Sequence, residues 1–230
     1  MRKTVALFAA ALVLTIGTQA MAAGFMLAEQ DSTASARSLA VTAKLENPST
    51  LFFNPAGLTF LNGWNASVGF TAAMPDFNYS DPAGLRPDAQ AAIGPIWVPH
   101  LYLSHTSQDK AAVGIGMNAP FGLALIWPDG FAGEHESSKI DLQVPTVYIG
   151  VAARPIKELS FGVTLRIAPA SVEMERKFAL LKPDGTEGEG HLALAASAIG
   201  VGASAGIMAR PLPWIHIGAS YLSRMKLDFD

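Results

Sequence analysis

The chain has 230 residues, of which 50% are hydrophobic and 15% are charged, and it contains 21 glycines and no cysteine. Soluble domains carry roughly 25% charged residues, so the composition argues against an ordinary soluble protein, and the lack of cysteine excludes a disulfide framework within the chain. The formal net charge of −3 gives no reason to expect nucleic acid as a partner.

The first residues predict an exported protein. Arg2 and Lys3 precede an apolar run over residues 5–16, and Ala20-Met21-Ala22 follows it. The run is too short to span a bilayer, and a charged start followed by a small-x-small site is typical of a secretory signal peptide. We expect residues 1–22 to be removed after Ala22; an N-terminal membrane anchor is the alternative.

Residues 23–62 are expected to form a small N-terminal unit. Asp31–Lys44 predicts a short helix with Asp31 or Ser32 as its N-cap. Two Asn-Pro steps, Asn47-Pro48 and Asn54-Pro55, then enclose the apolar residues Leu51–Phe53. Each proline removes a backbone donor and disfavours helix in the residue before it, so we expect a compact knot that is neither helix nor strand. An ordinary loop packed on a core is the alternative.

Residues 63–230 predict antiparallel strands, because apolar residues alternate with small or polar ones at a period of two. The expected strands, about seven in number, cover Trp64–Ala72, Ile96–His105, Ala111–Phe121, Ile140–Ala153, Leu159–Ala168, His191–Ala209 and Ile215–Tyr221. Short connections alternate with long ones, which is the layout of an outer-membrane β-barrel. A soluble sandwich is the alternative, but its loops need not sort by length.

In such a barrel, apolar side chains face lipid and polar ones face the lumen. The tryptophans at strand ends (Trp64, Trp97 and Trp214) suit an interfacial girdle. The apolar parity switches across Pro145 and again across Pro169, and we expect a one-residue bulge at each, since proline cannot donate to a β-ladder. The expected lumenal residues are Asn65, Asn118, Arg166, His216, Arg224 and Lys226.

Two other patterns compete with this interpretation. The uncharged run Leu192–Ala209 is long enough for a transmembrane helix, but its Gly, Ala and Ser content favours a strand. Gly202-Ala203-Ser204-Ala205-Gly206 matches the G-x-S-x-G nucleophile elbow, yet His216 precedes Asp228, which is the wrong order for a triad. The sequence offers no metal-ligand spacing or phosphate loop, so we expect neither an enzyme nor a cofactor.

Several segments together carry a resemblance to one family. They are Ala23-Gly24-Phe25, Ser49–Leu58, His100-Leu101-Tyr102, Gly114–Gly122, Trp127–Gly133 and Tyr221–Phe229. These segments resemble the FadL family of outer-membrane transporters for long-chain fatty acids and other hydrophobic compounds. The resemblance implies an all-β protein, a fourteen-strand transmembrane barrel with an N-terminal hatch, of which residues 63–230 would supply about half. The expectation that the chain is an N-terminal half rests on this strand count.

The resemblance also implies roles for individual residues. Asn54, Pro55 and Ala56 correspond to the hatch motif, and Asn118, Pro120 and Gly122 lie at a kink that ends the third strand and opens the wall sideways. The expected ligand-binding residues are Phe25, Leu27, Arg166, Arg176, Phe178 and Leu180. A lumenal arginine would hold a carboxylate, and Arg166 and Arg176 are the two candidates.

The function that follows is capture of a long-chain fatty acid or similar hydrophobic molecule by extracellular loops, with lateral release into the outer membrane after the hatch moves. The implied partners are this ligand and outer-membrane lipid, and the implied state of a complete barrel is a monomer. Uptake of aromatic hydrocarbons, a non-transporting surface adhesin and a secreted soluble sandwich are the alternatives.

Overall fold

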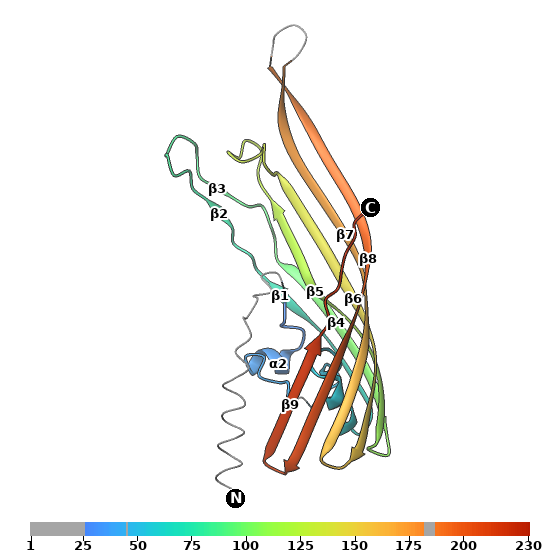
Figure 1. Ribbon diagram of the computed structural model, residues 1–230. Helices are drawn as coiled ribbons and strands as arrows, with labels where there is room; N and C mark the ends of the chain where they lie inside the picture. Colours follow the sequence, from blue (N-terminus) through green and yellow to red (C-terminus); the bar gives the residue numbers. More distant parts are fainter. Residues whose placement is uncertain (1–25, 45, 182–186) are drawn as a thin grey trace, which may run out of the picture.

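The computed structural model describes residues 26–44, 46–181 and 187–230. One antiparallel sheet of seven strands curls around a concave inner face (Figure 1). Its strands, in sheet order, are β1 (Gly63–Ala73), β4 (Ile96–Ser107), β5 (Ala111–Ile126), β6 (Lys139–Ile156), β7 (Leu159–Leu181), β8 (Glu187–Leu212) and β9 (Ile215–Leu222). The short strands β2 (Asn78–Tyr79) and β3 (Ala89–Gln90) pair separately. The expected all-β, half-barrel architecture is confirmed.

The strands are longer than the period alone predicted. β5 runs through Pro120 to Ile126, and β7 and β8 pair from Leu159↔Ala209 to Leu181↔Glu187. The run considered as a transmembrane helix therefore lies within strand β8. Across the described ranges, no helix has the length and apolar character needed to cross a membrane. We call the end with the short connections the turn end and the opposite end the loop end.

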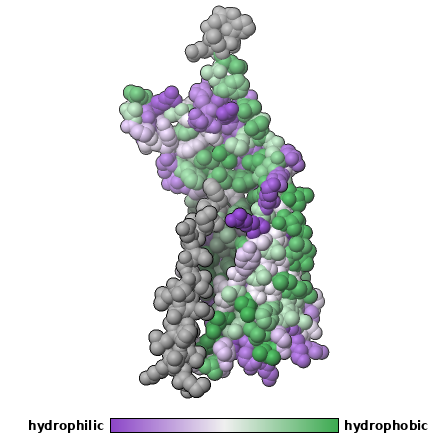
Figure 2. Space-filling view, in the orientation of Figure 1, coloured by the Kyte–Doolittle hydropathy of each residue, from purple (hydrophilic) through white to green (hydrophobic). Residues whose placement is uncertain are grey.

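The outer face of the sheet is apolar over a band near the turn end, as the alternation predicted. On β7 the exposed side chains include Phe161, Val163 and Leu165, whereas Thr164 and Arg166, which alternate with them, are buried. At about 3.3 Å per residue and a strand tilt near 40°, the outer apolar stretch Leu159–Pro169 spans about 25 Å, which is the height of a lipid-facing band. Figure 2 shows hydrophobic residues along this wall, with hydrophilic ones gathered at its lower edge.

Above Pro169 the two faces of the sheet exchange character. Between β6 and β7 the register is the same from Lys139↔Glu175 to Ala153↔Phe161, although residues 144–146 and 168–170 are not paired with each other, and β7 and β8 pair without a shift. The register shift opposite Pro145 places the extra residue in β5 and not in β6. The bulges predicted at Pro145 and Pro169 are therefore wrong. Instead, the side chains on the inner face are apolar in this part of the sheet (Leu142, Val144, Ala170 and Val172), and those on the outer face are polar (Gln143, Ser171 and Glu173).

The N-terminal segment, Met26–Asn62, lies in the concavity of the sheet (Figure 1). The helix expected over Asp31–Lys44 is only α2 (Ser32–Ala36), because Ser38 and Leu39 have left-handed backbones with φ of 49° and 65°. Asp31 is its N-cap as predicted. The Asn-Pro knot is helical, contrary to expectation: it forms α3 (Thr50–Phe53) and the 3₁₀-helix η1 (Pro55–Phe60). The predicted signal peptide lies outside the described residues.

Glycines on the inner face let this segment contact the strand backbones directly. A Cβ on Gly162 would lie 2.5 Å from the backbone nitrogen of Ala56, and one on Gly206 would collide with the Asn54 side chain. Asn54 Nδ2 donates to the carbonyls of Thr42 (2.8 Å) and Ile207 (3.1 Å), and its Oδ1 accepts from Ala56 N (3.1 Å). The predicted hatch motif is thus the point where the segment joins β7 and β8.

Candidate functional site

An apolar cavity of about 290 Å³ opens on the inner face of the sheet, next to Arg166 of β7. Its apolar lining comes from β5, β6, β9 and the chain that follows β9, and comprises Phe121, Val144, Leu222, Met225 and Leu227; Ser223 and Arg224 also line it. Ala168, Ala170 and Ala198 support this wall from β7 and β8. A buried charged group thus lies at the edge of a mainly apolar cavity, an arrangement typical of sites for amphipathic ligands.

Arg166 is 4% exposed and only partly hydrogen-bonded. Its Nη2 donates to the carbonyls of Ser223 (2.6 Å) and Ala203 (3.4 Å). Within the described ranges, its Nε has no acceptor and no carboxylate pairs with the guanidinium. A buried cation without an anionic partner is costly, so an anion placed here would gain both charge compensation and hydrogen bonds.

A layer of polar side chains on the inner face contacts the N-terminal segment. Asn118 Nδ2 donates to Tyr102 Oη (2.8 Å), which in turn donates to the backbone carbonyl of Gln30 (3.4 Å). Tyr148, the register partner of Arg166, packs edge-on against Phe52 with ring centroids 5.8 Å apart. Tyr102, Asn118 and Tyr148 lie on the inner face of the sheet, so this layer links α3 and the start of the N-terminal segment to strands β4, β5 and β6.

The predicted kink of the third strand is a bulge at Ala119-Pro120, where the pairing with β6 shifts between Asn118 and Phe121. We expected this kink to end the strand, but β5 continues beyond Gly122. The freed backbone groups bind the N-terminal segment: Leu27 N donates to Pro120 O (2.7 Å), and Met26 bridges Phe121. Leu27 therefore lies at the kink and not in the cavity lining; Phe25 lies outside the described residues.

The remaining predicted ligand-binding residues lie higher on β7. Arg176 lines a separate cavity of about 220 Å³ with Met174, Leu192 and Leu194. Phe178 and Leu180 are 39% and 46% exposed. Ten residues of strand, or about 33 Å, separate Arg176 from Arg166, so the structure places the two arginines at different levels. Between these levels the inner side chains are Ala168, Ala170, Val172 and Met174 on β7, paired with Gly200, Ala198, Ala196 and Leu194 on β8.

Sequence reasoning missed the cavity residues Val144, Met225 and Leu227. The parity change around Pro145 contained the signal for Val144, since it marks the point where apolar side chains turn inward. Met225 and Leu227 lie after the last strand, and their packing against the inner face near Gly200 depends on long-range contacts. Of the other cations assigned to the lumen, Arg224 lines the cavity, whereas Lys226 is exposed and pairs with Asp228 at 2.7 Å.

The connection between β5 and β6 folds around an aromatic cluster. Trp127 stacks on Phe131 with centroids 4.2 Å apart, and Tyr79 meets Phe131 edge-on at 5.0 Å. The connection is held to β7 by Lys177, which pairs with Glu134 (3.1 Å) and with the exposed Asp129 (3.0 Å). The predicted apolar loop thus buries part of its own aromatic surface.

Acidification is expected to loosen this connection. The Lys177 side chain, and then the Gly130 N–H, hold the pKa of Glu134 below its usual range. The folded state therefore binds fewer protons than the unfolded state, whose glutamates titrate near about pH 4.3; the stabilisation is complete above that pH and is lost as the pH falls through the lower folded pKa. Trp127 fluorescence should report the change, and Glu134→Gln should remove its pH dependence. An unchanged pH profile in Glu134→Gln would contradict this assignment.

Comparison with known proteins gives consistent matches. The sequence model of the family described as "Outer membrane protein transport protein (OMPP1/FadL/TodX)" matches residues 13–230. The "Long-chain fatty acid transport protein" of Escherichia coli K12 is 28% identical over 167 residues, covering 71% of this chain and 37% of that protein. "Outer membrane protein P1" of Haemophilus influenzae is 24% identical, covering 97% of this chain and 58% of its own length.

Solved structures show the same fold. A FadL homologue of Pseudomonas aeruginosa superposes with a TM-score of 0.69 at 17% identity, covering 88% of this chain and 53% of the other. The toluene transporter TodX of P. putida superposes with a TM-score of 0.64 at 22% identity, covering 77% and 51%. This chain spans about two fifths of the length of the E. coli protein and about half of the solved chains. The names of these relatives are those of transporters and outer membrane proteins, not of enzymes.

Proposed function

The chain belongs to the outer membrane protein transport family (OMPP1/FadL/TodX), and from this membership and its inner cavity we propose that it serves the uptake of long-chain fatty acids. In this proposal the turn end is periplasmic, the loop end is extracellular, and residues 23–62 are a hatch. The ligand binds with its carboxylate at Arg166 and its acyl chain along the apolar inner face of β7 and β8.

The observation that carries the proposal is the exchange of faces above Pro169. Inner side chains are apolar from Leu180 down to Ala168, apart from Arg176, and they become polar at Arg166 and Thr164. An aqueous pore would need polar residues along this whole path, whereas an acyl chain gains free energy by moving from one apolar surface to the next. The path ends at a buried cation, which suits a ligand with an acidic head.

Release is proposed to be sideways, at the bulge of β5. Pro120 has no N–H to donate to the neighbouring strand, and its carbonyl is bound by Leu27 of the hatch. A shift of Met26–Gln30 would withdraw these contacts from the strand. The glycine contacts that hold Asn54 and Pro55 would remain, so that movement of the hatch start would open the wall while the rest of the hatch stays seated.

Aromatic hydrocarbons are the second candidate ligands, because TodX is named as a toluene transporter and shares the fold. The two candidates differ at Arg166. A hydrocarbon leaves the guanidinium unpaired, whereas a carboxylate compensates its charge, so the buried position of Arg166 favours the acid.

Competition binding to the purified protein tests this proposal. Oleate, oleyl alcohol and toluene would each displace a fluorescent fatty acid; the two oleyl ligands have the same chain and differ in the head group. We expect oleate to bind at least about tenfold more tightly than the alcohol, as is typical of a charge-assisted hydrogen bond. Equal affinity of the two oleyl ligands, or preference for toluene, would contradict it. Growth on oleate of a strain that lacks its own transporter would test uptake.

A further inference from the structure

Two connections at the turn end repeat one sequence and one geometry. Ala153-Arg154-Pro155-Ile156 ends β6, and Ala209-Arg210-Pro211-Leu212 ends β8. In both, two residues of the four, the arginine and the proline, lie opposite a single residue of the next strand, because the register shifts between Ala153 and Ile156 and between Ala209 and Leu212. A bulge of this kind re-aims a side chain, and here it does so twice for an arginine.

Both guanidinium groups lie over the same aromatic ring. The Cζ of Arg210 is 3.8 Å from the ring centroid of Phe60, and the Cζ of Arg154 is 4.8 Å from it. Phe60 is the last residue of η1, so its ring lies close to the end of the N-terminal segment that leads into β1. Both distances are within the range in which a cation is attracted to an aromatic face.

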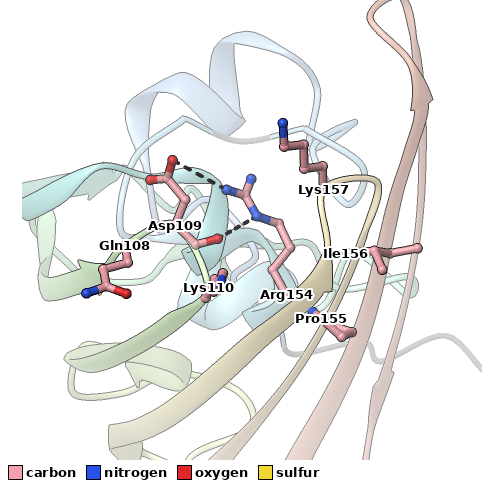
Figure 3. Close-up of a pocket in the computed structure, with 7 residues that line it drawn as sticks. All are labelled: Gln108, Asp109, Lys110, Arg154, Pro155, Ile156 and Lys157. Atoms are coloured by element: carbon pink, nitrogen blue, oxygen red, sulfur yellow. Dashed lines mark hydrogen bonds and ion pairs between the residues drawn. The ribbon is translucent and has the colours of Figure 1, made fainter.

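The two arginines differ in their other contacts. Arg154 Nε donates to Asp109 O (2.7 Å), and its Nη2 lies 3.7 Å from Asp109 Oδ2 (Figure 3). Arg210 is half-buried, no acceptor for its Nε is found in the part of the chain that the structure describes, and its guanidinium stacks on the Phe60 ring. Exposed charge pairs at this end contribute little, but a cation stacked on a ring and withdrawn from water contributes more.

We propose that Phe60, Arg154 and Arg210 form a latch that keeps the N-terminal segment seated at the turn end and so seals this end of the protein. This proposal concerns only the closure of the turn end, so it does not depend on whether the ligand is a fatty acid. It adjoins a second fixed contact, in which Thr59 Oγ1 donates to Ser160 Oγ (2.8 Å) and Ser160 Oγ donates to Ala56 O (2.8 Å). Movement of the segment is then confined to its start, around Met26–Gln30.

Cysteine labelling of the protein, purified in detergent, tests the latch. The chain has no cysteine, and Leu61, which follows Phe60, is 6% exposed and has no hydrogen-bonding side chain, so Leu61→Cys reports exposure of this end to a maleimide. We expect Phe60→Leu, which keeps an apolar side chain, to raise the labelling rate about tenfold, and Arg210→Lys to raise it about threefold. Because both changes remove the same contact, the double variant should label no faster than Phe60→Leu alone.

Lys157→Gln is the matched control, since Lys157 lies on the same connection as Arg154 but is exposed and does not contact Phe60. Its labelling rate should equal that of the parent. A parental rate in Phe60→Leu, with folding verified by heat-modifiable gel migration, would overturn the latch, and so would an equal increase in Lys157→Gln. If Phe60→Leu does not fold, Arg210→Lys decides, and an unchanged rate in that variant would overturn the proposal.

Discussion

Replacing Gly162 by alanine is expected to prevent the N-terminal segment from seating against β7. The new Cβ would lie 2.5 Å from the nitrogen of Ala56 and 2.7 Å from the carbonyl oxygen of Pro55. These are backbone atoms on a segment that Asn54 and Thr59 hold by hydrogen bonds, so they cannot rotate away as a flexible side chain would. Overpacking of this kind costs about 3 kcal/mol, and heat-modifiable gel migration with a thermal melt would measure the loss.

Gly94→Ala is the matched control for this experiment. A Cβ at Gly94 meets nothing within 4 Å, and the residue lies in the connection after β3. The control should therefore assemble and melt as the parent does. If Gly162→Ala folds with the stability of Gly94→Ala, the segment is not held against the sheet in the way the structure describes.

The alternation of residue types predicted the membrane part of the sheet well, because lipid on one face and water or protein on the other impose a strict period of two. Phe161, Val163 and Leu165 face outward, and Arg166 faces inward, as expected. The same alternation led to the wrong prediction of a one-residue bulge at Pro145 and at Pro169. A change of parity has two causes, an inserted residue or an exchange of the faces' environments, and the sequence does not distinguish them.

The N-terminal unit was less predictable, because its conformation depends on what it contacts. The sequence indicated a turn at Asn54-Pro55, and only the family resemblance indicated a hatch role for Asn54. Two of its four side-chain hydrogen-bond partners, the carbonyls of Ile207 and Ala219, are more than 150 residues away in the chain. The local signals indicated a capped helix at Asp31 but not its early end at Ser38. Among the site residues, Arg166 was the first choice for the carboxylate contact and Arg176 its competitor, and of the two only Arg166 lies beside the inner cavity.

Arg166→Gln is expected to weaken oleate binding by about 10- to 100-fold while leaving oleyl alcohol unaffected. The range follows from the loss of a charge-assisted hydrogen bond to a buried group, about 1.5–3 kcal/mol. Fluorescence displacement with both ligands measures the effect. The substitution removes a cation that is 4% exposed and has no ion pair among the described residues, which favours folding, and also removes its hydrogen bonds to Ser223 and Ala203, which opposes it. We therefore expect only a small change in the melting temperature.

Two further variants separate charge from shape at this position. Arg166→Lys keeps the charge but not the planar fork, so oleate affinity should fall between those of the parent and Arg166→Gln. Arg224→Gln removes the other cation of the cavity lining, which is exposed, and should change oleate affinity by less than about threefold because water screens an exposed charge. A loss of affinity that is the same for acid and alcohol in Arg166→Gln would mean that Arg166 shapes the cavity and does not bind the carboxylate, because a head-group contact must discriminate between two ligands with identical chains.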